Sequence, residues 1–318
     1  MKSALMLAFL LANEGGAEEW LHQLRQADRL AAEKRYGEAE AAYIAARQEA
    51  QKFGADQLAV ATASSHMGHY FQMVGRLREA QWAETEALAI VERRLGTTNT
   101  NTVRLALDLS TVYLELGEVS KTESLIRRFL RGGDDLSPAD RAILLAELAS
   151  VMTCKQDFED AEALYRAALP VFEREPTPDF RERTMIGLSN LSVLYMRMGR
   201  FSEGVTYSGR AQTLLRTIAD PPPLLVLKTM ANAAAVAAVT GKVNDADSLF
   251  QFAISHCEKH FGPNYYLMGY VMDNYAEFLR RVGRRNDAKM AHKRANAILH
   301  SFGKENMTGL TVDPKTFR

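Results

Sequence analysis

The stretch Asn190–Gly204, NLSVLYMRMGRFSEG, decides the fold. Gly199 stands at a turn in this stretch, and a second small residue, Gly204, follows it five positions later. Apolar residues recur on both sides of the turn at the three- and four-residue spacing of one helix face. The pattern therefore predicts two helices that leave one tight turn with their apolar stripes facing each other. The stripes consist of Leu188, Leu191, Leu194 and Tyr195 before the turn and Phe201, Val205, Ala211, Leu214 and Leu215 after it.

The same pairing of a turn with a small residue recurs along the chain. Four pairs are clear, and three weaker ones fill the gaps between them, at intervals of 41, 42, 39, 43, 42 and 42 residues. Self-similarity at such a period is the mark of a repeat protein, so the sequence predicts seven helix pairs. The clear pairs are Gly75 with Ala80, Gly199 with Gly204, Gly241 with Ala246 and Gly283 with Ala288, and the weaker ones are Lys34 with Ala39, Gly117 with Thr122 and Gln156 with Ala161.

Two further features repeat with the turns. An apolar residue followed by glycine stands about twenty residues after four of the turns, where glycine suits the end of a helix. In every repeat except the third, a second small residue lies in the second helix, where it lets the paired helices approach closely. Repeat three departs from the pattern with Thr122 and Phe129, which predicts a locally altered packing, and Pro170 is expected to kink its helix or end it early. The glycine markers are Phe53-Gly54, Leu95-Gly96, Phe261-Gly262 and Phe302-Gly303, and the second small residues are Ala46, Ala87, Ala168, Ala211, Ala253 and Ala295.

These motifs resemble the tetratricopeptide repeat. The 42-residue period, with Phe-Gly or Leu-Gly after the second helix, is similar to the kinesin light chain-type subclass, and the resemblance covers residues 18–304. It implies an all-α fold, a right-handed α-solenoid of about seven antiparallel helix pairs. Length alone would predict two domains, whereas the repeats predict one solenoid over 18–304 and a C-terminal tail over 305–318.

The first seventeen residues have the layout of a signal peptide. Lys2 is followed by an apolar run of about ten residues and by small residues ahead of a cleavage point after Ala17. The run is too short to span a bilayer. We therefore expect a periplasmic or secreted protein without an integral membrane span, with a cytoplasmic protein whose first helix caps the fold as the alternative.

Composition and motifs exclude several classes of function. The chain has 39 basic and 39 acidic residues, so it lacks the net positive charge that favours nucleic-acid binding. Cys154 and Cys257 fit neither a disulfide framework nor a zinc motif, and the histidine pairs offer two ligands where zinc needs about four. No phosphate-binding glycine loop, G-x-S-x-G motif or metalloprotease motif occurs. We expect no enzyme, no metal and no cofactor.

The first helix of each pair is expected to line a continuous concave surface. Candidate binding residues on it are those that lie outside the apolar stripe. Asn190, Asn232 and Asn274 each stand nine residues before their turn glycine. The full set of candidates is His66, His69, Asp108, Glu147, Asn190, Arg197, Asn232, Asn274 and Arg281.

A row of amides supplies both donors and acceptors and can hold the backbone of an extended peptide. In similar tetratricopeptide domains inner-helix asparagines bind peptide backbone, and the resemblance implies this role here. The alternative is that each amide bonds a neighbouring repeat or faces water. The sequence therefore favours a scaffold that binds a peptide or protein segment in the groove, with a structural solenoid that acts through self-association or envelope assembly as the competing hypothesis.

Overall fold

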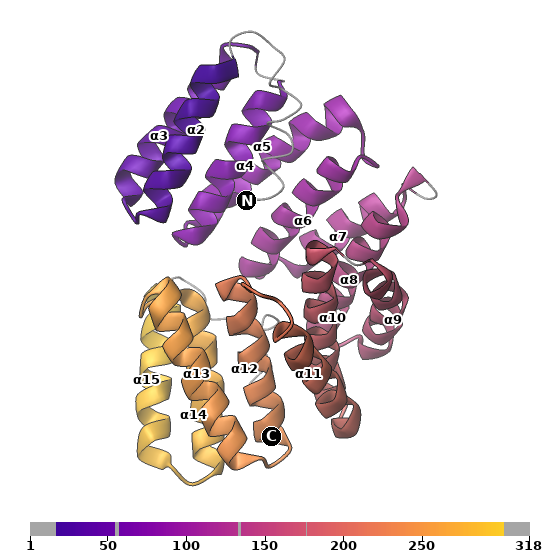
Figure 1. Cartoon of the computed structure of the whole chain (residues 1–318), viewed down its shortest axis with the longest axis vertical. Coiled ribbons are helices and arrows are strands. Elements are labelled where there is room, and N and C mark those ends of the chain that lie inside the picture. Colours follow the sequence, from indigo (N-terminus) through magenta and orange to yellow (C-terminus); the bar gives the residue numbers. More distant parts are fainter. Residues whose placement is uncertain (1–16, 55–56, 133–134, 176, 302–318) are drawn as a thin grey trace. The chain divides into compact units, whose positions relative to one another are not determined.

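The computed structural model describes residues 17–54, 57–132, 135–175 and 177–301. Fourteen α-helices and no β-strand occur in these ranges (Figure 1). None of the helices in the described ranges has the length and apolar character needed to cross a membrane. The helices are α2 (Ala17–Ala32), α3 (Tyr36–Gln51), α4 (Leu58–Met73), α5 (Leu77–Leu95), α6 (Thr100–Glu115), α7 (Val119–Leu130), α8 (Pro138–Lys155), α9 (Phe158–Arg174), α10 (Pro178–Arg197), α11 (Phe201–Leu215), α12 (Pro223–Val239), α13 (Val243–Phe261), α14 (Tyr266–Arg281) and α15 (Arg285–Ser301).

The chain forms two compact units, and the division falls within α8, after Asp140. In unit one α2 packs on α3, α4 on α5 and α6 on α7. In unit two α10 packs on α11, α12 on α13 and α14 on α15, while α8 meets α9 through Ala142, Ala168 and Phe172. The all-α solenoid of helix pairs is confirmed. The predicted signal segment and tail lie almost wholly in 1–16 and 302–318, outside the described residues, and stay predictions.

All seven predicted turn residues have a positive φ, between 62° and 83°. The residue after each turn donates its backbone N–H to a carbonyl five residues earlier, as Arg200 does to Tyr195 at 2.8 Å. This is the Schellman geometry that closes a helix end. Lys34 and Gln156 adopt it without being glycine, so the two weakest members of the sequence pattern make the same turn as the strongest.

Small residues are buried where the paired helices meet. The residue five positions after each turn is buried in all seven repeats, and so is the second small residue of the six second helices that have one. The structure adds a third small position, seven residues before the turn, which the predicted pattern did not include. All seven residues there are buried, namely Ala27, Gly68, Ser110, Ala149, Ser192, Ala234 and Ala276. At Gly204 an added Cβ would lie 2.5 Å from Sδ of Met196. Close helix approach therefore explains the choice of glycine there.

Repeat three keeps the helix pair and changes its details. Phe129 is fully buried where other repeats have alanine, and α7 has 12 residues, the fewest of any described helix. The hydroxyl of Thr122 is buried and lies 3.5 Å from the carbonyl of Ser110. Pro170 does not end its helix, because α9 continues to Arg174. The helix therefore continues past a residue that removes one backbone hydrogen bond and crowds the carbonyl four residues before it.

An arginine after the turn connects successive repeats within each unit. Arg76, Arg200 and Arg284 each follow a turn glycine and pair with two carboxylates, one three residues later and one on the preceding second helix. Such partly exposed pairs contribute about 0–1 kcal/mol each, so they fix the register of neighbouring repeats more than they add stability. The bridges to the preceding repeat are Arg76–Glu40 at 2.6 Å, Arg200–Glu162 at 2.7 Å and Arg284–Asp247 at 3.0 Å.

Candidate binding surface on the first helices

All nine candidate residues lie on first helices of the pairs. In unit one His66 and His69 are on α4 and Asp108 is on α6. In unit two Glu147 is on α8, Asn190 and Arg197 are on α10, Asn232 is on α12, and Asn274 and Arg281 are on α14. The two sets belong to different units, so each is described separately.

His66 is tied to the preceding repeat. Its Nδ1 lies 3.0 Å from Oδ1 of Asp28, and the same oxygen accepts a hydrogen bond from the Tyr43 hydroxyl at 2.7 Å. Burial pushes the pKa of Asp28 upward, but the contacts from His66 and Tyr43 outweigh it and leave that pKa below its ordinary value. His66 is itself buried. This histidine therefore joins two repeats within unit one.

His69 lies between two carboxylates. Its Nε2 is 3.7 Å from Oδ1 of Asp108, and its Nδ1 is 3.7 Å from Oε1 of Glu84 and 2.9 Å from the carbonyl of Ser65. Burial alone would lower the pKa of His69, but Asp108 and Glu84 raise it to about 9. The two acidic side chains therefore favour the protonated imidazole, which lies on a first helix of unit one.

Glu84 is a member of this cluster that the sequence did not reveal. It lies on the second helix α5, is 1% exposed, and packs against Gly68, where an added Cβ would lie 2.5 Å from its Oε1. Burial raises the pKa of Glu84 to about 8. Gly68 stands seven residues before its turn, at a position where the other repeats have alanine or serine. This glycine was the one sequence signal for a buried side chain such as Glu84.

Asn190 and Asn232 use their amide nitrogens to contact the preceding repeat. Nδ2 of Asn232 donates to the Ser189 hydroxyl at 3.0 Å, and Nδ2 of Asn190 lies 3.5 Å from the Ser150 hydroxyl, which also contacts Tyr165. The amide oxygens are used differently. Oδ1 of Asn232 and Oδ1 of Asn274 are buried, and neither has a hydrogen-bond partner among the described residues.

The charged candidates of unit two are held in place to different degrees. Arg197 donates to the carbonyl of Thr153 at 3.0 Å and stacks over the ring of Phe158 at 5.2 Å. Glu147 is half-buried, Arg281 is exposed, and both make further contacts. Cys154 and Cys257 are free thiols, and burial raises the pKa of Cys154 to about 11 and that of Cys257 to about 12. Over the described ranges no three His, Cys, Asp or Glu side chains are grouped so that they could hold a metal ion.

Comparison with known proteins supports the fold. No known protein-family profile matches the chain. Over 234 residues it is 22% identical to Protein KINESIN LIGHT CHAIN-RELATED 2 from Arabidopsis thaliana. The aligned stretch covers 72% of this chain and 35% of that protein. The chain thus spans about a third of the length of that relative.

Two solved structures share the architecture. A tetratricopeptide repeat protein from Parabacteroides merdae aligns with a TM-score of 0.57 and 16% identity, over 94% of this chain and 98% of its own. NprR in complex with its cognate peptide NprX aligns with a TM-score of 0.64 and 14% identity, over 89% of this chain and 78% of its own. With the repeat period, the seven turns and the buried small residues, these likenesses show that the chain has the tetratricopeptide-repeat fold and resembles kinesin light chain-type repeat proteins.

Proposed function

We propose that this protein is a non-enzymatic interaction scaffold that binds a peptide or protein segment on the first helices of unit two. The unpartnered amide oxygens of Asn232 and Asn274 carry this proposal. They occupy equivalent positions on α12 and α14, nine residues before the turn, so they repeat with the helices. The similar fold of NprR, which was solved with a peptide, supports this type of ligand.

The two ends of each amide serve different purposes in this proposal. The nitrogen of Asn232 bonds Ser189 of the preceding repeat, and the buried oxygen, which has no partner among the described residues, accepts a backbone N–H of a ligand that displaces the side chains covering it. A buried acceptor without a partner costs about 1–3 kcal/mol. A ligand that donates a hydrogen bond to such an oxygen recovers that cost, once at Asn232 and once at Asn274.

Self-association through the last helix has less support. Ala291, Ala295 and Ile298 of α15 are buried with residues of α14 and do not form an apolar outer face. Met290 is exposed on that helix, and so are the neighbouring residues Lys289 and Lys293. The exposed lysines beside Met290 disfavour the stacking of another copy on this face.

Selection from a peptide library tests the proposal. Random dodecapeptides displayed on phage are panned in parallel against the wild-type protein and against the Asn232→Ala/Asn274→Ala variant, whose helicity is checked by circular dichroism. We expect peptides to be enriched on the wild type and lost on the variant. No enrichment on the wild type, or equal enrichment of the same peptides on both proteins, would reject the proposal.

We also propose that the protein is exported and works outside the cytoplasm. The signal-like layout of residues 1–17 supports this. Mass spectrometry of the protein from fractionated cells tests it: a mature N-terminus at Glu18 is expected, and an intact Met1 would overturn export.

A further inference from the structure

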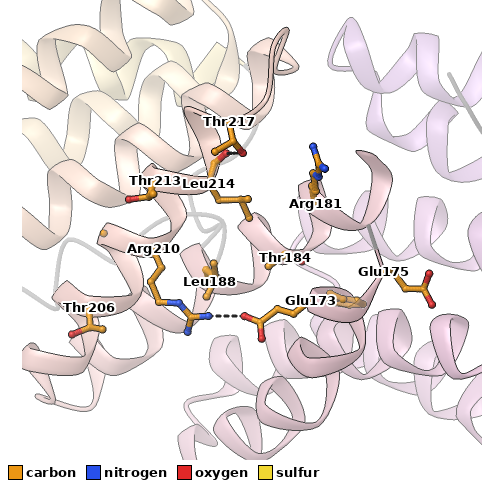
Figure 2. Close-up of a pocket in the computed structure, with 12 residues that line it drawn as sticks. Glu173, Glu175, Arg181, Thr184, Leu188, Thr206, Arg210, Thr213, Leu214 and Thr217 are labelled. Atoms are coloured by element: carbon orange, nitrogen blue, oxygen red, sulfur yellow. Dashed lines mark hydrogen bonds and ion pairs between the residues drawn. The ribbon is translucent and has the colours of Figure 1, made fainter. Parts of the chain in front are cut away.

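Unit two contains a cavity of about 700 Å³ that the first-helix surface does not include. Its walls are the end of α9, the first half of α10 and much of α11 (Figure 2). Known small-ligand sites have volumes of about 300–1,000 Å³, so this cavity is large enough for several residues of a peptide.

Gly209 in the middle of α11 leaves one position of that cavity wall without a side chain. Glycine inside a helix costs about 1 kcal/mol relative to alanine, and here no close packing requires it, because an added Cβ would meet nothing within 4 Å. Gly204 and Gly269, in contrast, have a neighbouring side chain within 2.6 Å of such a Cβ. In the other repeats the position ten residues after the turn holds larger side chains, namely Ile44, Thr85, Arg127, Arg166, Gln251 and Lys293.

The cavity walls combine an apolar base with hydroxyl acceptors. Phe172 and Leu188 are buried, and Leu214 joins them. Thr184 and Thr206 each donate their hydroxyl hydrogen to a carbonyl of their own helix, at 2.7 and 2.9 Å. Each of these oxygens keeps lone pairs that can accept a bond. The walls therefore suit a ligand with an apolar side chain and N–H donors.

Four charged side chains line the cavity, and Arg181 and Glu175 are the two that make no ion pair among the described residues. Glu173 and Arg210 pair with each other at 2.6 Å, reaching from α9 to α11 beside Leu188 (Figure 2). Equivalent pairs join other second helices, Glu92 with Arg128 and Glu258 with Arg294, so this bridge belongs to the scaffold. Arg181 is exposed on the α10 wall, makes no ion pair among the described residues, and points away from that bridge in Figure 2.

We propose that this cavity is a second binding site, for a short peptide with an aliphatic or aromatic side chain next to a carboxylate. The apolar side chain lies on Phe172, Leu188 and Leu214, backbone N–H groups donate to the threonine hydroxyls, and the carboxylate pairs with Arg181. A fatty acid has the carboxylate and an apolar chain but no N–H donors, so it leaves the threonine acceptors unused. The site is independent of the asparagine row.

Methyl-resolved NMR of the whole protein tests this site. The probes are two libraries of N-acetylated, C-terminally amidated tetrapeptides, each with Leu or Phe at the second position, Asp or Asn at the third, and random residues at the first and fourth. Decanoate is tested separately. We expect the Asp library to shift the methyl signals of Thr184, Thr206, Thr213, Leu188 and Leu214, and the Asn library to bind about fivefold more weakly, as expected for the loss of one partly exposed ion pair. Equal binding of the two libraries, no shift with either, or shifts with decanoate alone would overturn the proposal.

Two pairs of variants localise the effect. Gly209→Leu fills the cavity and abolishes the shifts, while Ser202→Leu on the exposed start of the same helix leaves them unchanged. Arg181→Gln weakens binding of the Asp library to the level of the Asn library, while Arg174→Gln, which is exposed but does not line the cavity, has no effect. Asn232→Ala/Asn274→Ala retains the shifts, which separates this site from the proposed function. If Gly209→Leu is folded, with a thermal unfolding midpoint at or above that of the wild type, and the Asp library still shifts the methyl signals, the peptide binds elsewhere and the proposal is wrong.

Discussion

Asn232 joins two repeats through its nitrogen and presents an unpaired oxygen. The sequence predicted that such asparagines either bind a ligand or bond a neighbouring repeat, and the structure assigns the second role to one end of the amide only. The partner, Ser189, lies 43 residues earlier, and nothing in its local sequence distinguishes it from Ser192, the other serine on the same helix. Pairings across repeats depend on how the helices stack, which a single sequence does not show.

His69 makes a pH-dependent contribution to stability. Its pKa in the folded protein is about 9, above the ordinary value of 6.5, because Asp108 and Glu84 favour the cation. A raised pKa means that this stabilisation is complete below pH 6.5 and is lost as the pH rises through 9. Glu84, raised to about 8 by burial, acts in the same direction at lower pH.

Replacing Asp108 tests this assignment. Asp108→Asn removes one carboxylate, so the NMR titration midpoint of the His69 imidazole is expected to fall, and the loss of stability between pH 6.5 and 9 is expected to become shallower. The wild-type titration measured in parallel is the reference. An unchanged midpoint in Asp108→Asn contradicts the role of this carboxylate.

At the scale of the element, the turn is set by backbone conformation more than by residue type. Gln156 has a φ of 68° and is exposed. A non-glycine residue in this region costs about 1 kcal/mol or more, so Gln156→Gly is expected to raise the free energy of unfolding by about 0.5–1 kcal/mol. The reverse change, Gly199→Gln, is expected to lower it by a similar amount in urea denaturation. Equal stability of all three proteins contradicts the left-handed turn.

The two glycines of α11 are expected to respond in opposite ways to the same substitution. Gly204→Ala places a methyl group against Met196 and the carbonyl of Ser192, and overpacking of this kind costs about 1–3 kcal/mol. Gly209→Ala meets open space and gains about 1 kcal/mol from helix propensity. Thermal unfolding measures both. Destabilisation by both substitutions would show that Gly209 also has a packing role.

Across the whole molecule, repetition made most of the fold predictable. Seven copies of one pattern identified the turns even where Lys34 or Gln156 replaces glycine, because their positions follow from the neighbouring copies. Departures from the repeat were harder to predict. In the sequence, Glu84 looks like any other acidic residue on a second helix, and only the structure shows that it packs against Gly68. The cavity beside Gly209 depends on how α9, α10 and α11 are spaced, which the repeat pattern does not specify.

The central claim is that the unpartnered amide oxygens hold a peptide. Calorimetric titration of one library-selected dodecapeptide into three proteins tests it: the wild type, Asn232→Ala/Asn274→Ala, and Ser189→Ala, which loses the bond between repeats but keeps both amide oxygens. Two hydrogen bonds of about 0.5–1.5 kcal/mol each predict that the double variant binds roughly 5- to 150-fold more weakly, while Ser189→Ala stays within about twofold of the wild type. Wild-type affinity in the double variant, or an equal loss in Ser189→Ala, would contradict the account.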